Sequence, residues 1–398
     1  MVDVSTVATL VVATATSFFM AWAIGAGSSG STPFAPAVGA NAISVMRAGF
    51  VVGLLGFLGA VLQGANVTEA VGRELIRDVT LSPTAATVGL LTAGILVVIG
   101  VFAGYPIATA FTVTGAVVGV GLGLGGQPAW AKYREIATLW VLVPFVGGGA
   151  AYGTARVLQS DRTPVVAAVP ALAALVAAVV ANVEFALLGP AGEGGSIAGT
   201  GGAALPGLTG GALTGRLVVT LAAMLVVGVL SYRDTERDPA VGQRRLLLAL
   251  GGLVAFSAGG SQVGLALGPL LPLLDRVPLS IPLSLVLAGG GLGLLVGSWT
   301  GAPRMIKALS QDYSSLSPRR SIAALIPAFL IAQTAVLFGV PVSFNEVVVS
   351  AIVGSGYAAG TGGVSREKIV YTVLAWIGSL VLAIAISYVG FVAIDAVA

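Results

Sequence analysis

Residues 25–32 read Gly-Ala-Gly-Ser-Ser-Gly-Ser-Thr and interrupt a hydrophobic run near the start of the chain. A second stretch rich in small residues, Ser-Ala-Gly-Gly-Ser-Gln at 257–262, interrupts another hydrophobic run in the second half. Irregular backbone is tolerated at membrane depth only where protein or water surrounds it. Interruptions at corresponding places of two related halves are typical of secondary transporters with broken helices.

The segments that follow each interruption come in the same order. A long apolar segment and a charged loop lead to an apolar run that begins at Pro106 in one half and at Pro341 in the other. A short basic loop follows, at 132–135 and at 366–368, and then a further apolar segment. This order indicates that the chain contains two sequence repeats.

The composition places the chain in a membrane. It is 57% hydrophobic and 9% charged, with a mean hydropathy of +1.01, whereas a soluble domain carries about 25% charged residues. The absence of Cys and His excludes disulfides, thiolate catalysis, His–Cys metal sites and Ser–His–Asp triads. Because no nucleophile–base set is present, we expect neither an enzyme nor a cofactor. The sequence contains no basic stripe of the kind that binds nucleic acid. We therefore expect no nucleic-acid partner.

The hydrophobic runs predict an all-α polytopic membrane protein with about twelve crossings, since one crossing needs about 20 apolar residues. Residues 246–274 are expected to form one crossing from two half-helices around 257–262, and residues 25–44 a re-entrant or non-crossing element. The full spans are expected near 5–24, 46–64, 83–104, 106–126, 136–155, 164–188, 216–232, 279–299, 321–340, 342–360 and 369–392.

The loop charges orient these spans in the bilayer. With the N-terminus outside, the inside loops carry most of the Lys and Arg residues, as the positive-inside rule requires. These loops are 156–163, 233–245, 301–320 and 361–368. We therefore expect a multi-pass protein of the plasma membrane.

An odd number of crossings separates the two interruptions, so the repeats are expected to have inverted topology. The first repeat is expected at 1–157 and the second at 246–398, with connecting spans and loops at 158–245. A substrate site then lies near the midplane between the repeats.

The interruptions supply the first candidate substrate ligands. A half-helix N-terminus presents unpaired N–H groups and a positive dipole end to an anion, and hydroxyls add donors. The alternative is close helix packing through small residues, but repetition of the pattern favours a site. The predicted ligands are Ser28, Ser29, Ser31 and Thr32 from the first stretch and Ser257, Ser261 and Gln262 from the second.

The proline-initiated runs supply further candidates. Proline suits the first turn of a helix, so Pro106 and Pro341 are expected to begin helices. Thr109, Ser343 and Asn345 would then lie near the helix starts and donate to an anion, the alternative being ordinary N-capping.

Glu346 is the clearest acidic residue inside a predicted apolar span. An intramembrane carboxylate is a functional candidate by default, and an apolar environment favours its protonated form. The alternative is a structural hydrogen bond or ion pair. We predict that Glu346 carries the coupling proton, whereas Glu184, near a span end, is explained by an interfacial position.

At these motifs the sequence resembles the inorganic phosphate transporter (PiT) family of secondary transporters, over residues 5–157 and 246–392. Each repeat of that family carries Gly-Ala-Asn-Asp and a later Pro-Val-Ser-Thr-Thr-His-like segment. Here the first motif reads Gly-Ala-Gly-Ser at 25–28 and Gly-Gly-Ser-Gln at 259–262. The histidine positions are Phe111 and Glu346. The missing Asn-Asp pairs and the Glu look closest to the sulfate-permease branch of the family.

These departures favour sulfate as the substrate. Phosphate near neutral pH keeps an O–H and needs an acceptor such as aspartate, whereas a site of donors alone suits sulfate. The sequence predicts an ion-coupled symporter of a tetrahedral inorganic oxyanion, sulfate first, with phosphate as the alternative. A passive anion channel and a non-transporting homologue are further alternatives.

The same departures bear on the coupling ion. The carboxylates that the resemblance would assign to sodium binding are missing, so H⁺ is the expected coupling ion. Na⁺ held by backbone carbonyls at the broken helices is the alternative. The expected partners are the oxyanion and the lipid bilayer, and the resemblance also allows a homodimer.

Overall fold

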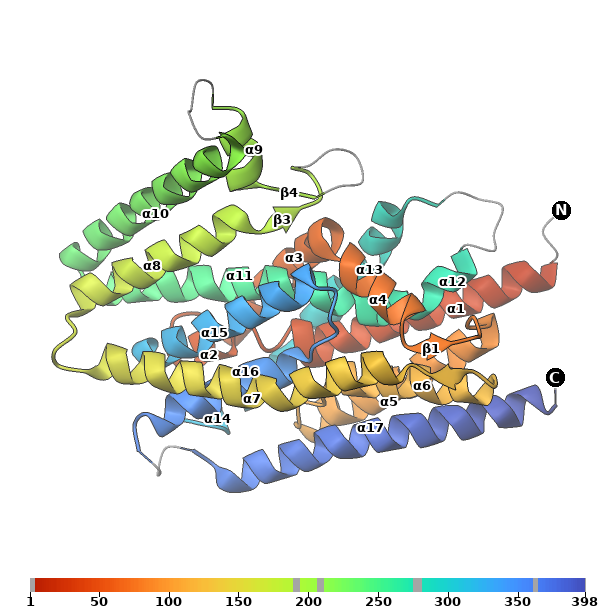
Figure 1. The fold of residues 1–398 in the computed structure, drawn as a ribbon. Helices are drawn as coiled ribbons and strands as arrows, with labels where there is room; N and C mark the ends of the chain where they lie inside the picture. The colour runs from red at the N-terminus through yellow and green to blue at the C-terminus, as the bar shows by residue number, and fades with distance from the viewer. Residues whose placement is uncertain (1–3, 189–193, 206–210, 275–280, 361–363, 398) are drawn as a thin grey trace.

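The computed structural model describes residues 4–188, 194–205, 211–274, 281–360 and 364–397. Helices dominate it, and most of them run along one common direction (Figure 1). Within the described residues, ten helices are long and apolar enough to cross a membrane. The all-α membrane architecture is therefore confirmed.

The long helices are α1 (Val4–Ile24), α3 (Val45–Gln63), α5 (Pro83–Ala103), α7 (Trp130–Gln159), α8 (Val165–Asn182), α10 (Gly211–Arg237), α11 (Pro239–Leu267), α13 (Leu283–Thr300), α15 (Pro318–Leu337) and α17 (Arg366–Asp395). The shorter helices are α2 (Ala35–Gly39), α4 (Ala65–Arg73), α6 (Thr109–Gly123), α9 (Ile197–Ala203), α12 (Leu271–Leu274), α14 (Ala302–Gln311) and α16 (Phe344–Tyr357).

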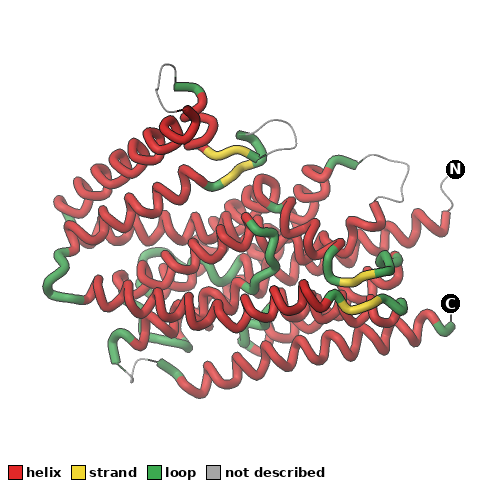
Figure 2. Tube along the Cα trace, viewed as in Figure 1, coloured by secondary structure: helices red, strands yellow, loops and turns green. Residues whose placement is uncertain are grey.

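Two short antiparallel strand pairs lie among the helices (Figure 2). Strand β1 (Ile76–Arg77) pairs with β2 (Gln127–Pro128), and β3 (Glu184–Phe185) pairs with β4 (Gly195–Ser196). Each pair is a separate two-stranded sheet.

The two halves contain the same kinds of element in inverted orientation. Helices α3, α4, α6 and α7 of the first half have counterparts in α13, α14, α16 and α17 of the second. The matched helices α7 and α17 have the same length, 30 residues each. The α7–α8 and α10–α11 connections lie at one end of the bundle, and the start of α1 and the end of α17 lie at the other (Figure 1), as the predicted orientation requires.

Two predicted crossings contain short helices. Helix α6 has 15 residues and α16 has 14, fewer than the roughly 20 that a full span needs. The count of about twelve crossings therefore rests on ten long helices and these two short ones.

The expectation that Pro106 and Pro341 begin helices is wrong. Ala108 is the N-cap of α6 and Ser343 is the N-cap of α16, so both prolines precede the helix start. Proline has no N–H and restricts the residue before it to extended conformations. Each proline therefore favours a non-helical segment that enters a short helix inside the bundle.

The first interruption does break the regular helix. Helix α1 continues into a π-helical turn at Gly25–Ser29, called η1, and a turn then leads to α2. π-Helical turns are rare and occur often at functional sites. The crossing extends to Ser29, so irregular backbone occupies its inner end.

The second interruption is not a break, and the two half-helices expected there are wrong. Helix α11 is continuous through residues 257–262, and the helix changes only at the 3₁₀ turn η2, Gly268–Leu270. A Cβ on Gly259 would collide with the carbonyl oxygen of Gly56, and one on Gly59 with that of Phe256. The small residues there allow close contact between α11 and α3, so the packing alternative explains the glycines of this motif.

The buried core lies among helices of both halves. Helix α11 is buried along most of its length between α3 and α15, and α6 packs on α17 while α7 packs on α16. Helix α10, by contrast, lies at the periphery beside α8 (Figure 1) and buries only Gly215 and Thr235 among its described side chains. This arrangement places the broken elements at the centre of the bundle.

Candidate functional site

Three broken or short elements meet α11 at the centre of the bundle. They are η1, the start of α6 and the start of α16, and the polar side chains where they meet are almost completely buried. These are Ser28, Thr109, Gln262, Asn345 and Glu346, each exposed by no more than 1%. The structure thus brings together residues that lie far apart in both repeats.

Ser28, Thr109 and Gln262 form a polar triangle. The Oε1 atom of Gln262 lies 2.7 Å from Thr109 Oγ1 and 3.1 Å from Ser28 Oγ, and the two hydroxyl oxygens are 3.4 Å apart. The Nε2 atom of Gln262 donates to the carbonyl oxygen of Val342 at 2.8 Å. Ser28 and Gln262 occupy the matching positions of the two repeat motifs, so the repeats touch at equivalent residues.

Asn345 joins the same elements through its amide nitrogen. Nδ2 donates to the carbonyl oxygens of Gly27, at 2.9 Å, and Ile107, at 2.6 Å. Only the NH₂ group can donate to two carbonyls, so these contacts fix the amide orientation. Asn345 Oδ1 is then left buried, with no hydrogen-bond partner in the described ranges of the chain.

The remaining hydroxyls of the first interruption have two kinds of environment. Ser31 and Thr32 donate to the carbonyl oxygen of Ser28, at 3.2 and 3.0 Å. Ser29 Oγ and, in the second motif, Ser261 Oγ are buried without a partner in the described residues. The hydroxyls of Ser29 and Ser261 are therefore the ones free to donate.

The first turn of α16 contains both Ser343 and Glu346. Ser343 Oγ accepts the Glu346 backbone N–H at 3.4 Å, so Ser343 acts as an N-cap. The Glu346 side chain is 1% exposed, and its Oε2 has no hydrogen-bond partner among the residues that the structure describes. A negative charge near a helix N-terminus is stabilised by the helix dipole. At the matching position of the first repeat, Phe111 stacks on Trp140 with ring centroids 3.9 Å apart.

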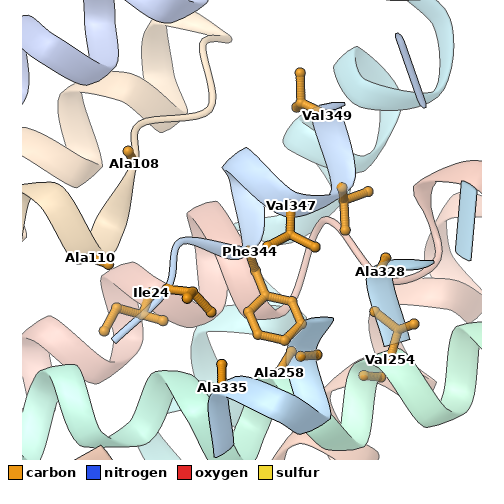
Figure 3. Close-up of a cluster of buried hydrophobic side chains, with 14 of the residues drawn as sticks. Ile24, Ala108, Ala110, Val254, Ala258, Ala328, Ala335, Phe344, Val347 and Val349 are labelled. Atoms are coloured by element: carbon orange, nitrogen blue, oxygen red, sulfur yellow. The ribbon is translucent and has the colours of Figure 1, made fainter. Parts of the chain in front are cut away.

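Phe344, which follows the N-cap of α16, packs against apolar side chains. Figure 3 shows its ring among Ala258 of α11, Ala335 of α15 and Ile24 at the end of α1. The ring is completely buried. It therefore fixes the start of α16 against three other helices.

Ser257 does not belong to this centre, contrary to the expectation from sequence. Its hydroxyl accepts a hydrogen bond from Gln333 Nε2. Gln333 and Gln63 exchange amide hydrogen bonds of 3.3 and 3.4 Å, and Gln63 also donates to the backbone oxygen of Glu184 at 2.8 Å. Gln63 and Gln333 line a separate cavity of about 860 Å³.

The glutamine pair and the two tryptophans that support the centre were not predicted from the sequence. The signal for Gln63 and Gln333 is a polar amide within an apolar segment. Trp140 Nε1 donates to the carbonyl oxygen of Pro341 at 3.1 Å, and Trp376 Nε1 donates to that of Pro106 at 2.7 Å. Each indole thus holds the extended segment that leads into the short helix of the other repeat.

The centre presents more free acceptors than the sequence suggested. The amide donors of Gln262 and Asn345 are used on backbone carbonyls, and so are the hydroxyls of Ser31 and Thr32. Within the described part of the chain, the buried atoms without partners include the acceptors Asn345 Oδ1 and Glu346 Oε2 as well as the hydroxyls of Ser29 and Ser261. A mixed set of this kind can accept as well as donate hydrogen bonds.

Comparisons with known proteins agree with this architecture. A putative phosphate permease of Thermococcus kodakarensis is 27% identical over 93% of this chain and 94% of its own length. The chloroplastic inorganic phosphate transporter 2-1 of Arabidopsis thaliana is 26% identical over 90% of this chain and 68% of its own length. A solved structure described as the sodium-dependent phosphate transporter superposes with a TM-score of 0.82 at 22% identity, covering 98% of this chain and 100% of that chain.

The family comparison covers nearly the whole molecule. Residues 24–387 match the model of the phosphate transporter family, a range that includes most of both halves and the connecting helices α8 and α10. The chain is a multi-pass membrane protein, consistent with the plasma membrane, and it belongs to the phosphate transporter family.

Proposed function

We propose that this protein is an ion-coupled secondary transporter of inorganic phosphate. The observation that carries the proposal is the pair of unpartnered acceptors, Asn345 Oδ1 and Glu346 Oε2, in the first turn of α16. Phosphate near neutral pH keeps an O–H that can donate to such an oxygen. Sulfate has no proton to donate, so it would leave buried acceptors unpaired, which is costly.

The argument for sulfate depended on a site made only of donors. That premise weakens because the Asn345 amide donates to Gly27 and Ile107, and the Gln262 amide donates to Val342. The curated relatives named above are also described as phosphate permeases or phosphate transporters. We therefore favour phosphate, the alternative of the sequence analysis, over sulfate.

The proposed anion ligands are the residues around the polar triangle. Ser28, Thr109 and Gln262 would exchange their mutual hydrogen bonds for bonds to phosphate oxygens, and Ser29 and Ser261 would supply hydroxyl donors. The carboxyl group of Glu346 would accept from the phosphate O–H or carry the coupling proton. Rocking of one repeat against the other would open the centre to each side in turn.

Uptake of radiolabelled phosphate and sulfate into proteoliposomes tests the proposal. We expect saturable phosphate uptake, competed by arsenate and not by selenate, chromate or molybdate. Sulfate uptake competed by these last three anions would overturn the substrate. Flux that dissipates a gradient without concentrating the anion would indicate a channel, and absence of binding to either anion would indicate a non-transporting homologue.

The coupling ion is tested in the same vesicles by imposing a proton gradient or a sodium gradient alone. We propose protons, because Glu346 is a completely buried carboxyl group in the first turn of α16. The solved structure that shares this fold is described as sodium-dependent, so sodium is the competing candidate. Phosphate accumulation driven by sodium alone at equal pH would overturn proton coupling.

A further inference from the structure

Two repeat-related lysines occupy equivalent positions at opposite ends of the bundle. Lys132 is the third residue of α7 and Lys368 is the third residue of α17. In both helices a tryptophan that donates to a proline carbonyl follows eight residues later, Trp140 and Trp376. The side chains of the two lysines are mostly buried, with 15% and 18% exposed.

The acidic partners of the lysines are also repeat-related. Lys132 Nζ lies 2.8 Å from Glu74 Oε2, and Lys368 Nζ lies 3.2 Å from Asp312 Oδ2. Glu74 is the C-cap residue of α4, and Asp312 is the C-cap residue of its counterpart α14. The ion pairs therefore follow the internal symmetry of the fold.

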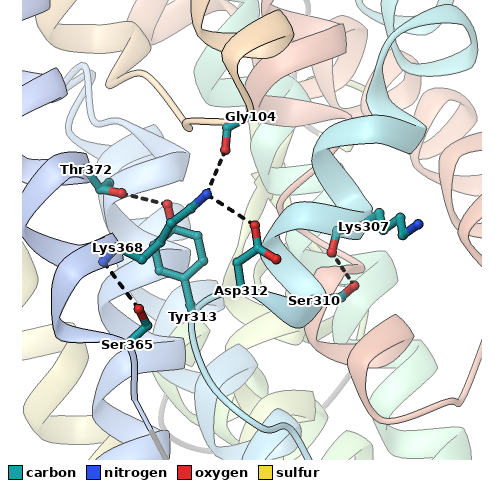
Figure 4. Close-up of polar contacts among 8 residues, drawn as sticks. All are labelled: Gly104, Lys307, Ser310, Asp312, Tyr313, Ser365, Lys368 and Thr372. Atoms are coloured by element: carbon teal, nitrogen blue, oxygen red, sulfur yellow. Dashed lines mark hydrogen bonds and ion pairs between the residues drawn. The ribbon is translucent and has the colours of Figure 1, made fainter.

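The further contacts of the two lysines break that symmetry. Lys368 Nζ also donates to the carbonyl oxygen of Gly104 at 3.3 Å (Figure 4). The same nitrogen lies 4.2 Å from the centre of the Tyr105 ring. The counterpart of Gly104 is Gly339, and both have positive φ, 74° and 62°. In the described residues Lys132 has no hydrogen bond to Gly339 and instead approaches Glu135, at 3.4 Å.

The Lys368 contact lies at the start of a chain segment that leads to the centre. Gly104 and Tyr105 begin the extended segment that passes Pro106, held by Trp376, and ends at Thr109 in the polar triangle. On the other side of Lys368, Tyr313 is buried and its hydroxyl lies 2.6 Å from that of Thr372. Burial raises the pKa of Tyr313, so the phenol stays protonated at neutral pH. Helix α17 thereby fixes this segment against the α14–α15 connection.

We propose that Lys368 and Lys132 are alternating latches of the transport cycle. The Lys368–Gly104 contact closes the inner mouth in the state described here, and it breaks when the centre opens inward. Because inverted repeats exchange their conformations during alternating access, Lys132 then engages the carbonyl oxygen of Gly339 and closes the outer mouth. This inference rests on the proposed transport function.

The chain has no native cysteine, so one introduced thiol can report opening of the inner mouth. Ala108, the buried N-cap of α6, lies between Tyr105 and Thr109 and accepts a small thiol in the variant Ala108→Cys. A membrane-impermeant maleimide is applied to everted vesicles, which expose the inner face. The labelling rate is measured for Ala108→Cys alone, for Ala108→Cys combined with Lys368→Met, and for Ala108→Cys combined with Lys132→Met.

We expect Lys368→Met to raise the labelling rate about tenfold. Loss of a charged hydrogen bond from the closed state shifts the equilibrium between the closed and open inner mouth by about this factor. Lys132→Met should leave the rate unchanged or lower it, because its contact closes the opposite state. An unchanged rate in Lys368→Met, or equal increases in both variants, would overturn the latch assignment. The size-exclusion elution volume and the melting temperature of each variant show whether the substitution destabilises the whole fold. Faster labelling in a variant that melts at a lower temperature would also overturn the latch assignment.

Labelling needs no substrate, so failure of the latch and failure of the proposed function can be told apart. A faster rate in Lys368→Met without phosphate uptake by the parent protein would keep the latch and overturn phosphate transport. Phosphate uptake by the parent protein with no change in labelling would keep transport and overturn the latch.

Discussion

The indole nitrogen of Trp376 lies 2.7 Å from the carbonyl oxygen of Pro106, so a helix of the second repeat holds a broken segment of the first. The reciprocal contact joins Trp140 to Pro341 at 3.1 Å. Proline-containing segments expose carbonyls that no helix satisfies, and inside a membrane an unpaired carbonyl is costly. The two indoles therefore stabilise irregular backbone next to the candidate site.

Loss of one indole donor should destabilise the protein. We expect Trp376→Phe to lower the free energy of unfolding by about 1–3 kcal/mol, because the Pro106 carbonyl is left buried and unpaired. The melting temperature of the purified protein checks this. Trp22→Phe is the control, since Trp22 donates to Thr300 at an exposed position. Equal melting shifts in the two variants would contradict the role of Trp376.

Removal of the side-chain NH₂ group of Asn345 should destabilise the protein. Asn345→Asp places a carboxyl oxygen against the carbonyls of Gly27 and Ile107 and should cost about 3 kcal/mol or more. Yield and melting temperature measure this effect. The control Asn182→Asp also loses an amide donor to a backbone carbonyl, that of Ala178. Asn182 is only partly buried and its oxygen still accepts from Arg216 at 2.6 Å, so we expect a smaller effect than at Asn345. A stable Asn345→Asp protein would show that these bonds do not join the elements.

The sequence predicted most of the architecture because hydrophobic runs and loop charges follow directly from the bilayer. It misjudged residues 257–262, since glycine and serine suit both a broken helix and a close helix contact. The composition cannot distinguish these cases, whereas the contact of Gly259 with Gly56 depends on a distant helix. At residues 25–32 the same composition does accompany irregular backbone.

The candidate site was predicted in its residues more than in its chemistry. Ser28, Thr109, Gln262 and Asn345 do meet, because repeated motifs of inverted repeats converge at the midplane. Which atoms remain free depends on the long-range bonds to Ile107 and Val342. Residue type alone does not reveal that the N–H groups of an amide already donate to backbone carbonyls. The sequence therefore suggested a site of hydrogen-bond donors only.

Thr109 is expected to affect substrate binding more than folding. Thr109→Val removes the hydroxyl that lies 2.7 Å from Gln262 and keeps the shape of the side chain. Loss of one hydrogen bond of about 1 kcal/mol corresponds to roughly a fivefold higher KM for phosphate uptake. The control is Thr112→Val, whose hydroxyl bonds Ala108 and Ser379 and should leave KM unchanged. Matching KM values for Thr109→Val and the parent protein would remove Thr109 from the site.

Glu346 should determine how transport responds to a proton gradient. Glu346→Gln keeps the size of the buried side chain but cannot gain or lose a proton. If Glu346 carries the coupling proton, the variant should lose phosphate accumulation driven by an acidic exterior. It should retain exchange of labelled for unlabelled phosphate across the membrane, because exchange requires no net proton movement.

The comparison with Glu184→Gln separates this role from a general effect of removing a carboxylate. Glu184 is a partly exposed residue of β3. The variant Glu184→Gln should therefore keep the rate of proton-driven phosphate uptake. A Glu346→Gln protein that still concentrates phosphate under a proton gradient alone would show that another group carries the proton. Loss of exchange together with accumulation would instead assign Glu346 to phosphate binding, since an uncoupled but intact site must still exchange its substrate.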